Sequence, residues 1–203
     1  MAYGTNAPFG LRPVSYLGSG PIPCPQNSYF VAYNYATALF TGDPVTLLAD
    51  GTIGRATGAN NGPVSGVFAG VQYYDVNNNL VNLPYWSNPA PPTFRNQNPV
   101  AFVLDDPNIL YDIQAGNAAG SGGAGILQVD LFSNATIGFG TAGSTVSGQS
   151  GAVLLAIDNT ATSPLKILRL TPVPGNAFGV NYNNVIVQIN DNPLRGSTGS
   201  GGV

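Results

Sequence analysis

Three carboxylates lie close together in the sequence, at Asp105, Asp106 and Asp112. Carboxylates grouped in this way could hold a divalent cation or act as a general acid and base. Neighbouring residues of a strand point to opposite faces, so Asp105 and Asp106 should not converge on one reacting atom. Asp106 also precedes Pro107, a pairing that is typical of turns because Asp caps its own backbone. We therefore expect a turn or capping role, with a cation site as the first alternative and a cation-dependent enzyme as the second.

The rest of the chain offers little for acid–base or metal chemistry. It has no His and no Glu, its single Lys is Lys166, and its single Cys, Cys24, lies between two prolines. His is the usual general base and zinc ligand, and no Gly-Lys-Ser/Thr phosphate loop surrounds Lys166. Asp75 opens a stretch similar to an EF-hand loop, but Leu80 and Trp86 occupy the positions that need Gly and Glu. We predict no enzymatic activity, no cofactor and no metal.

The charge content also excludes several partners. Charged residues make up 7% of the 203, with six cations, nine acids and a net charge of −3. Six scattered cations form no basic stripe, which argues against nucleic-acid binding. The longest apolar stretch, at residues 152–157, is far shorter than the roughly 20 residues that span a bilayer, and the first six residues lack the features of a signal peptide. We expect synthesis in the cytoplasm and no membrane partner.

The composition predicts an all-β fold. Gly, Pro and Asn, which break helices and build turns, supply about a third of the chain. Ten Tyr, nine Phe and many β-branched residues suit pleated sheets. Period-two patterns predict strands at 28–35, 45–48, 52–55, 64–74, 80–86, 100–104, 108–114, 127–131, 152–157, 165–170 and 185–189. Asp50-Gly51 predicts a hairpin, and Gly66 and Gly70 predict bulges or a close approach of another backbone. The architecture expected is a small barrel or a tulip-like β-sandwich with long Gly/Pro/Asn-rich loops.

The chain divides into three predicted parts. Residues 1–27 hold five prolines and little periodicity, which indicates an extended N-terminal arm. Residues 28–194 form the β-rich domain, and the Gly/Ser/Thr-rich residues 195–203 form a flexible C-terminal tail. Tyr85, Trp86 and the proline-rich loop after them either form an aromatic surface for sugars or pack in the core or an interface.

The most distinctive block of the sequence is 104–114 (LDDPNILYDIQ). Further short blocks, in order along most of the chain, are 7–14 (APFGLRPV), 38–45 (ALFTGDPV), 50–53 (DGTI), 55–57 (RAT), 66–71 (GVFAGV), 187–190 (VQIN) and 194–196 (LRG). Together these blocks resemble the capsid decoration (cement) proteins of tailed bacteriophages. Tyr111-Asp112 stands where the family pattern has Phe-Glu.

The resemblance implies a virion structural protein that binds the assembled major capsid protein on the outer surface of the head. Phe9, Leu11 and Arg12 are the expected capsid or subunit contacts, because they combine apolar anchors with one cation. A homo-oligomer is also expected, with a trimer favoured over a dimer. The alternative function is a glycan-binding β-domain of a tail fibre or adhesin, present in few copies per particle where a cement protein has hundreds.

Overall fold

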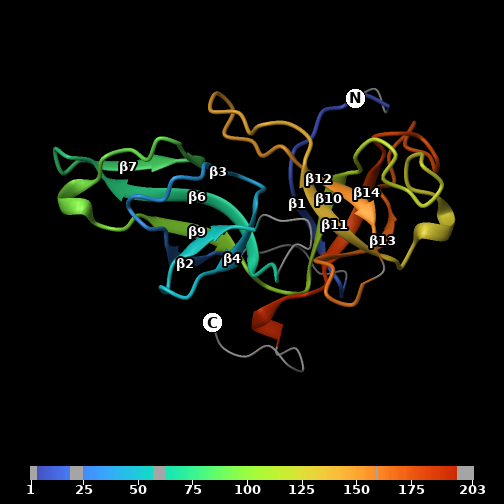
Figure 1. Cartoon of the computed structure of the whole chain (residues 1–203), viewed down its shortest axis with the longest axis horizontal. Helices are drawn as coiled ribbons and strands as arrows, with labels where there is room; N and C mark the ends of the chain where they lie inside the picture. The colour runs from blue at the N-terminus through green and yellow to red at the C-terminus, as the bar shows by residue number, and fades with distance from the viewer. Residues whose placement is uncertain (1–3, 19–24, 57–62, 159, 196–203) are drawn as a thin grey trace.

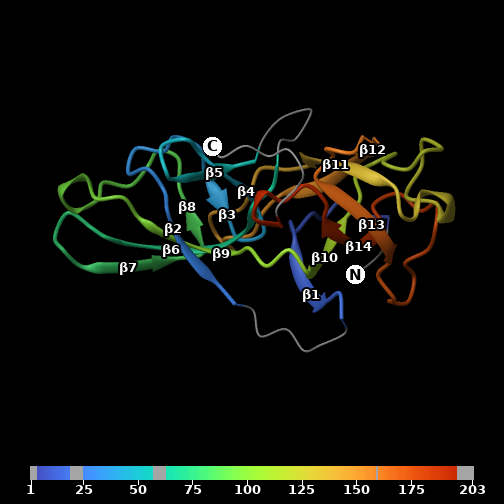
Figure 2. The same cartoon turned by 90° about the horizontal axis from the view of Figure 1, so that it is seen from below.

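A computed structural model of the chain describes residues 4–18, 25–56, 63–158 and 160–195. Within these residues the regular structure is almost entirely β, with three single-turn 3-10 helices, and the body is elongated with two lobes (Figure 1). None of the helices in these ranges is long or apolar enough to cross a bilayer. Figure 2 shows the two lobes side by side along the long axis.

Lobe I is built on one six-stranded antiparallel sheet, sheet I. Its strands run in the order β1 (Arg12–Tyr16), β10 (Ile109–Gln114), β14 (Asn184–Ile189), β13 (Leu165–Leu170), β11 (Asn134–Phe139) and β12 (Ala152–Ile157). The sheet curls until Leu154 of β12 forms an isolated bridge with Ala115, just after β10. One such contact leaves the sheet open, so lobe I is not a closed barrel.

Lobe II contains a second six-stranded sheet, sheet II, and a two-stranded pair. Sheet II has the order β2 (Asn27–Phe30), β9 (Val100–Leu104), β6 (Gly66–Tyr74), β4 (Pro44–Leu47) and β5 (Ile53–Arg55), with β7 (Leu80–Leu83) also paired to β6. The small pair joins β3 (Leu39–Phe40) to β8 (Tyr85–Trp86). The 3-10 helix η1 (Phe94–Asn96) precedes β9, while η2 (Gln128–Asp130) and η3 (Pro193–Arg195) lie in the later part of the chain.

The order of the strands shows that lobe II is an insertion into lobe I. The chain forms β1 in sheet I, then β2 to β9 in lobe II, and returns to sheet I at β10. β1 pairs with β10, and Arg12 lies opposite Asp112 in this ladder. The strands before and after the insertion are therefore hydrogen-bonded neighbours, so the two chain ends of lobe II are held side by side in sheet I.

The chain has two hydrophobic cores, and the larger one also includes Val67 of β6 and Leu104 of β9 from lobe II. The larger is centred on sheet I, with fully buried side chains that include Tyr111, Ile113 and Ile167. The smaller lies between sheet II and the β3–β8 pair, around Phe68 and Trp86. Burying a large apolar side chain contributes about 1.5–3 kcal/mol relative to exposing it, so both cores stabilise the fold substantially.

Three short segments join the lobes at what we call the junction: residues 9–12, 40–43 and 148–150. Leu11 N–H donates to Gly42 O at 2.9 Å, Thr41 N–H donates to Gly148 O at 2.9 Å, and Ser150 N–H donates to Thr41 O at 3.0 Å. Gly10 has φ +74°, and a Cβ there would lie 2.6 Å from Gly42 O. The backbones therefore meet so closely that only glycine fits at position 10.

The prediction of an all-β fold is confirmed, and of the two architectures left open the structure is a sandwich. The strands predicted at 100–104, 152–157 and 165–170 have the expected bounds. The predicted Asp50-Gly51 hairpin joins β4 to β5, and the expected bulge appears as a register shift between Phe68 and Gly70.

One predicted strand is wrong. Residues 127–131 alternate in polarity, yet they form the turn of η2. The carboxylate of Asp130 is buried and accepts a hydrogen bond from Leu127 N–H at 2.8 Å. This local bond gives the Leu127 N–H a partner that a neighbouring strand would otherwise provide, so the segment forms a turn and not a strand.

Residues 4–18 of the predicted N-terminal arm lie on lobe I, whereas Asn27, the last residue of that arm, begins β2 in lobe II. Arg12–Tyr16 form β1, and the residues before it cover the outer side of β10. Gln114 holds them there: its Oε1 accepts from Ala7 N–H at 2.9 Å and its Nε2 donates to Thr5 O at 3.2 Å. Cys24 and all of the predicted tail except Arg195 lie outside the described residues.

Candidate binding surfaces

The three clustered carboxylates do not converge. Asp105 is buried and accepts from Asn27 Nδ2 at 2.9 Å and from the Tyr29 hydroxyl at 2.6 Å. Burial, together with the hydrogen bond to Asp105, raises the pKa of Tyr29 to about 12. Asp106 Oδ1 accepts from Asn108 N–H at 2.8 Å, which is the predicted Asp-capped turn.

Asp112 has different surroundings again. Its buried carboxylate accepts from Thr171 Oγ1 at 2.5 Å. Burial raises the pKa of Asp112, while the Thr171 hydrogen bond and the positive charge of Arg12 act in the opposite direction. Within the described ranges no three His, Cys, Asp or Glu side chains are grouped so that they could hold a metal ion. The arrangement of these carboxylates is that of structural hydrogen-bond acceptors.

The three residues predicted as capsid or subunit contacts differ in their exposure to solvent. Phe9 and Leu11 are 5% and 1% exposed, so their side chains pack inside the chain. Arg12 is exposed, and its guanidinium carbon lies 4.3 Å from the centre of the Phe9 ring. The ring holds the cation by a cation–π contact. Arg12 is thus the member of the predicted set whose side chain an external partner could reach.

The three residues line a cavity of about 400 Å³ at the junction. Its other walls are Pro13, residues 41–42, Pro84 and residues 147–149. Val146, which precedes the wall residue Ser147, is 98% exposed at the tip of a loop. The cavity combines one cation with apolar walls, so it could receive an acidic side chain from a partner.

Trp86 cannot form the sugar-stacking surface suggested by its sequence context. It is fully buried, its Nε1–H donates to Tyr35 O at 3.0 Å, and Tyr73 packs edge-on with ring centres 5.7 Å apart. Tyr85 stacks on Phe40 at 5.9 Å. Both aromatic residues therefore belong to the packing of lobe II, as the second sequence interpretation expected.

The turn around η2 carries two exposed apolar side chains. Val129 is 78% exposed and Phe132 is 68% exposed. Phe132 has φ +68°, a left-handed conformation that bulky residues rarely adopt. The turn is fixed beneath them, because Asp130 accepts from Leu127 N–H and Phe132 N–H donates to Ile167 O at 2.8 Å. We call Val129 and Phe132 the apolar tip; in Figure 1 the turn lies at the outer end of lobe I.

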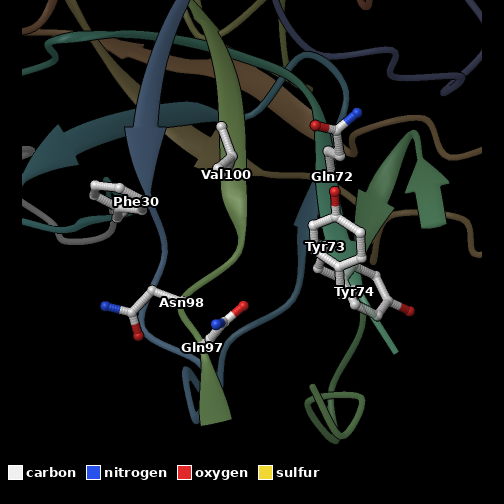
Figure 3. A pocket seen from close by; sticks show the side chains of 7 residues that line it. All are labelled: Phe30, Gln72, Tyr73, Tyr74, Gln97, Asn98 and Val100. Carbon is white, nitrogen blue, oxygen red and sulfur yellow. The ribbon is translucent and has the colours of Figure 1, made fainter. Parts of the chain in front are cut away.

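A second pocket lies on the outer face of sheet II, with a volume of about 390 Å³. Figure 3 shows its lining residues: Phe30, Gln72, Tyr73, Tyr74, Gln97, Asn98 and Val100. Phe30 is 54% exposed and Tyr74 is 46% exposed. None of the lining side chains is charged, and aromatic rings alternate with primary amides.

Neither the apolar tip nor the outer pocket was predicted from the sequence. For the pocket a signal existed: the alternation of 28–35 places Tyr29 and Val31 on one face, which leaves Phe30 on the other. For the tip the strand interpretation of 127–131 hid the signal, which is an Asp three residues after Leu127 that can cap a turn.

Comparison with protein-family models, curated proteins and solved structures finds no match to this chain. The resemblance to decoration proteins rests on the sequence blocks. In the structure four of these blocks contact one another: Leu11 N–H donates to Gly42 O across the lobes, Gly42 N–H donates to Phe68 O at 2.9 Å within lobe II, and Arg12 lies opposite Asp112 in sheet I. Blocks 7–14 and 38–45 thus supply two of the three junction segments, while the third, residues 148–150, lies outside the blocks.

Proposed function

We propose that this protein is a virion structural protein that binds the assembled lattice of a phage major capsid protein and stabilises the head from its outer surface. The apolar tip is the observation that carries the proposal. A left-handed conformation costs an ordinary residue about 1–2 kcal/mol, and most of the Phe132 side chain remains exposed, so burial within the chain offsets little of this cost. A partner that buries the ring accounts for both features.

The composition of the surface supports a docking role. Protein interfaces are enriched in aromatic residues and Arg and depleted of Lys and Glu. This chain has one Lys and no Glu, and its exposed apolar side chains include Val129, Phe132 and Val146. A protein that binds the assembled lattice and not its free subunits stabilises the lattice by mass action, with no chemical step.

Arg12 provides a second contact in this proposal. Its guanidinium is held over Phe9 beside the junction cavity, so it can pair with a carboxylate of the capsid protein without first being ordered. Phe9 and Leu11 are buried in the chain, so in this proposal their role is to position Arg12, and Arg12 makes the contact with the partner.

The proposal is tested by adding purified protein to phage heads that lack it and measuring the bound fraction after sedimentation. Phe132→Gly and Val129→Ser should each weaken binding about tenfold or more, which corresponds to about 1.4 kcal/mol. The melting temperature of Phe132→Gly should be equal to or above that of the wild type, since glycine accepts the left-handed conformation. Val76→Ser, which changes a 57% exposed residue of lobe II, is the matched control and should bind normally.

Two results would contradict the proposal: wild-type binding by both tip variants, or absence of the protein from purified heads. We also expect a homo-oligomer, with a trimer favoured over a dimer, because a closed symmetric oligomer engages identical neighbours equally. Native mass spectrometry that finds a lone monomer both in solution and on particles would refute that expectation.

A further inference from the structure

We propose that the pocket on the outer face of sheet II is a binding site for a neutral saccharide. The inference goes beyond the proposed capsid role and does not depend on it. It is carried by the side chains in Figure 3, by the register of the strands beneath them and by two hydrogen bonds that orient the amides.

The sheet places the lining residues on one rigid surface. Phe30 of β2 is directly opposite Val100 of β9, and Val100 is directly opposite Gln72 of β6. Residues opposite one another share a face, so these three form a row across the sheet. Tyr74 lies two residues further along β6, on the same face, and Asn98 lies just before β9. Figure 3 shows Phe30 on one side of the pocket and the tyrosines on the other.

The opposite face of the same strands is occupied by the core of lobe II. Tyr29, Val71 and Ala101, which alternate with the pocket residues, pack in that core. The positions of Phe30, Gln72 and Val100 are therefore fixed by buried neighbours. A site held on strands in this way is preorganised, which reduces the entropy lost on binding.

The amide groups are oriented before any ligand arrives. Gln72 Nε2 donates to Asn82 Oδ1 at 2.8 Å, which leaves Gln72 Oε1 as an acceptor. Asn98 Oδ1 accepts from Tyr33 N–H at 3.1 Å, which leaves Asn98 Nδ2 as a donor. A sugar hydroxyl is both a donor and an acceptor, so it can pair with either group.

The aromatic side chains complete the match to a sugar. Phe30 and Tyr74 each expose about half of their surface, and an aromatic face carries negative charge that attracts the polarised C–H groups of a pyranose ring. The volume of about 390 Å³ lies within the roughly 300–1,000 Å³ of small-molecule sites.

Other ligand classes fit the pocket less well. The lining residues include no cation for a phosphate or a nucleic acid and no acid for a basic ligand. A purely apolar ligand would cover Gln72 Oε1 and Asn98 Nδ2 without offering either a hydrogen-bond partner. An extended peptide would add along an open strand edge, such as that of β2, whereas the pocket lies on the face of the paired strands β2, β9 and β6.

The test uses calorimetric titration of the full-length protein with four trisaccharides. Three are neutral, namely maltotriose, tri-N-acetylchitotriose and a galactose-terminated trisaccharide; the fourth, sialyllactose, is negatively charged. We expect saturable binding of at least one neutral sugar and weaker binding of sialyllactose. Tyr74→Ala and Phe30→Ala should each weaken that binding about tenfold, and Gln72→Leu should weaken it several-fold.

Phe132→Ala is the control, since it removes an exposed aromatic side chain from the other lobe and should leave sugar binding unchanged. In return, Tyr74→Ala should bind phage heads normally, which separates the two proposals. The inference is overturned if no neutral trisaccharide binds, if sialyllactose binds best, or if the pocket variants bind as the wild type does. It is also overturned if Tyr74→Ala changes the oligomeric state, because the pocket would then be a contact between copies.

Discussion

The hydroxyl of Ser150 in lobe I donates a hydrogen bond to the buried carboxylate of Asp43 in lobe II. The same carboxylate accepts from Phe40 N–H at 2.9 Å, and Ser150 Oγ accepts from Ala152 N–H at 3.0 Å. Asp43 and Ser150 are 1% and 2% exposed. The pair is therefore a polar connection between the lobes that water does not reach.

The Ser150–Asp43 bond should stabilise the fold most where Asp43 is charged. Burial raises the pKa of Asp43 above its ordinary 3.8, while the bonds from Ser150 and Phe40 and the charge of Arg55 lower it. At pH 7, Ser150→Ala should reduce the free energy of unfolding by about 1.5–3 kcal/mol, the range for hydrogen bonds to charged groups. The loss should be smaller at pH 3, where Asp43 is protonated. Urea denaturation at several pH values measures both.

Asp43→Asn tests the sign of this linkage. Because the native pKa of Asp43 is raised, the folded chain keeps a proton that the unfolded chain has lost, and the contribution of Asp43 to stability falls as the pH rises from 3.8 through the native pKa. Asp43→Asn should remove this decrease in stability with rising pH, because Asn does not titrate. In the Asp43→Asn background the cost of Ser150→Ala should become independent of pH, and a cost that still varies with pH would exclude this pair as the source.

Gly10 should be far less tolerant of a side chain than Gly51, although both have positive φ. At Gly10, with φ +74°, an added Cβ would lie 2.6 Å from Gly42 O and from Ser150 Cβ; at Gly51, with φ +79°, nothing lies within 4 Å. Gly51→Ala should cost only the left-handed conformation, about 1 kcal/mol. Gly10→Ala should cost about 3 kcal/mol, because the junction must also move apart. Equal losses in thermal or urea unfolding would show that the junction yields easily.

The strands with strong period-two patterns were predictable, and the segments that cover them were not. In β10 the sequence predicts an inner face of Ile109, Tyr111 and Ile113 and a solvent face with Asp112 and Gln114. The structure buries both faces. The outer side chains are covered because Gln114 bonds to residues 5 and 7 and Asp112 bonds to Thr171. Such contacts join residues more than 50 positions apart, and local pattern carries no information about them.

The candidate surfaces illustrate the same limit. The sequence marks Phe9, Leu11 and Arg12 as apolar anchors with a cation, but it does not say whether the anchors face a partner or the chain itself. Here the insertion of lobe II places Gly42 against Leu11, and the Phe9 and Leu11 side chains are buried within the chain. Conversely, the residues of the outer pocket become neighbours only when β2, β9 and β6 are paired.

Trp86 should report on the interior of lobe II. As the only Trp, fully buried and bonded to Tyr35 O, it should give blue-shifted fluorescence that iodide does not quench in the native state. Trp86→Ala should lower the free energy of unfolding by about 3–5 kcal/mol, the range for large aromatic residues in a core. Efficient quenching in the folded protein would place Trp86 at the surface and revive the sugar-stacking hypothesis for that residue.

Tyr29 should titrate above the ordinary pKa of a tyrosine. Its hydroxyl donates to Asp105 at 2.6 Å, and the native pKa of about 12 lies above the ordinary 10.0. The sign of the linkage follows: the stabilisation is complete below pH 10 and is lost as the pH rises through about 12, because the unfolded chain releases this proton first. Tyr29→Phe should remove about 1–2 kcal/mol at pH 7, since Asp105 keeps Asn27 as a partner. Difference absorbance titration of wild type and Tyr29→Phe should show one fewer tyrosinate forming near pH 12 in the variant. If the variant instead forms one fewer tyrosinate than the wild type near pH 10, the Tyr29–Asp105 bond does not persist in solution.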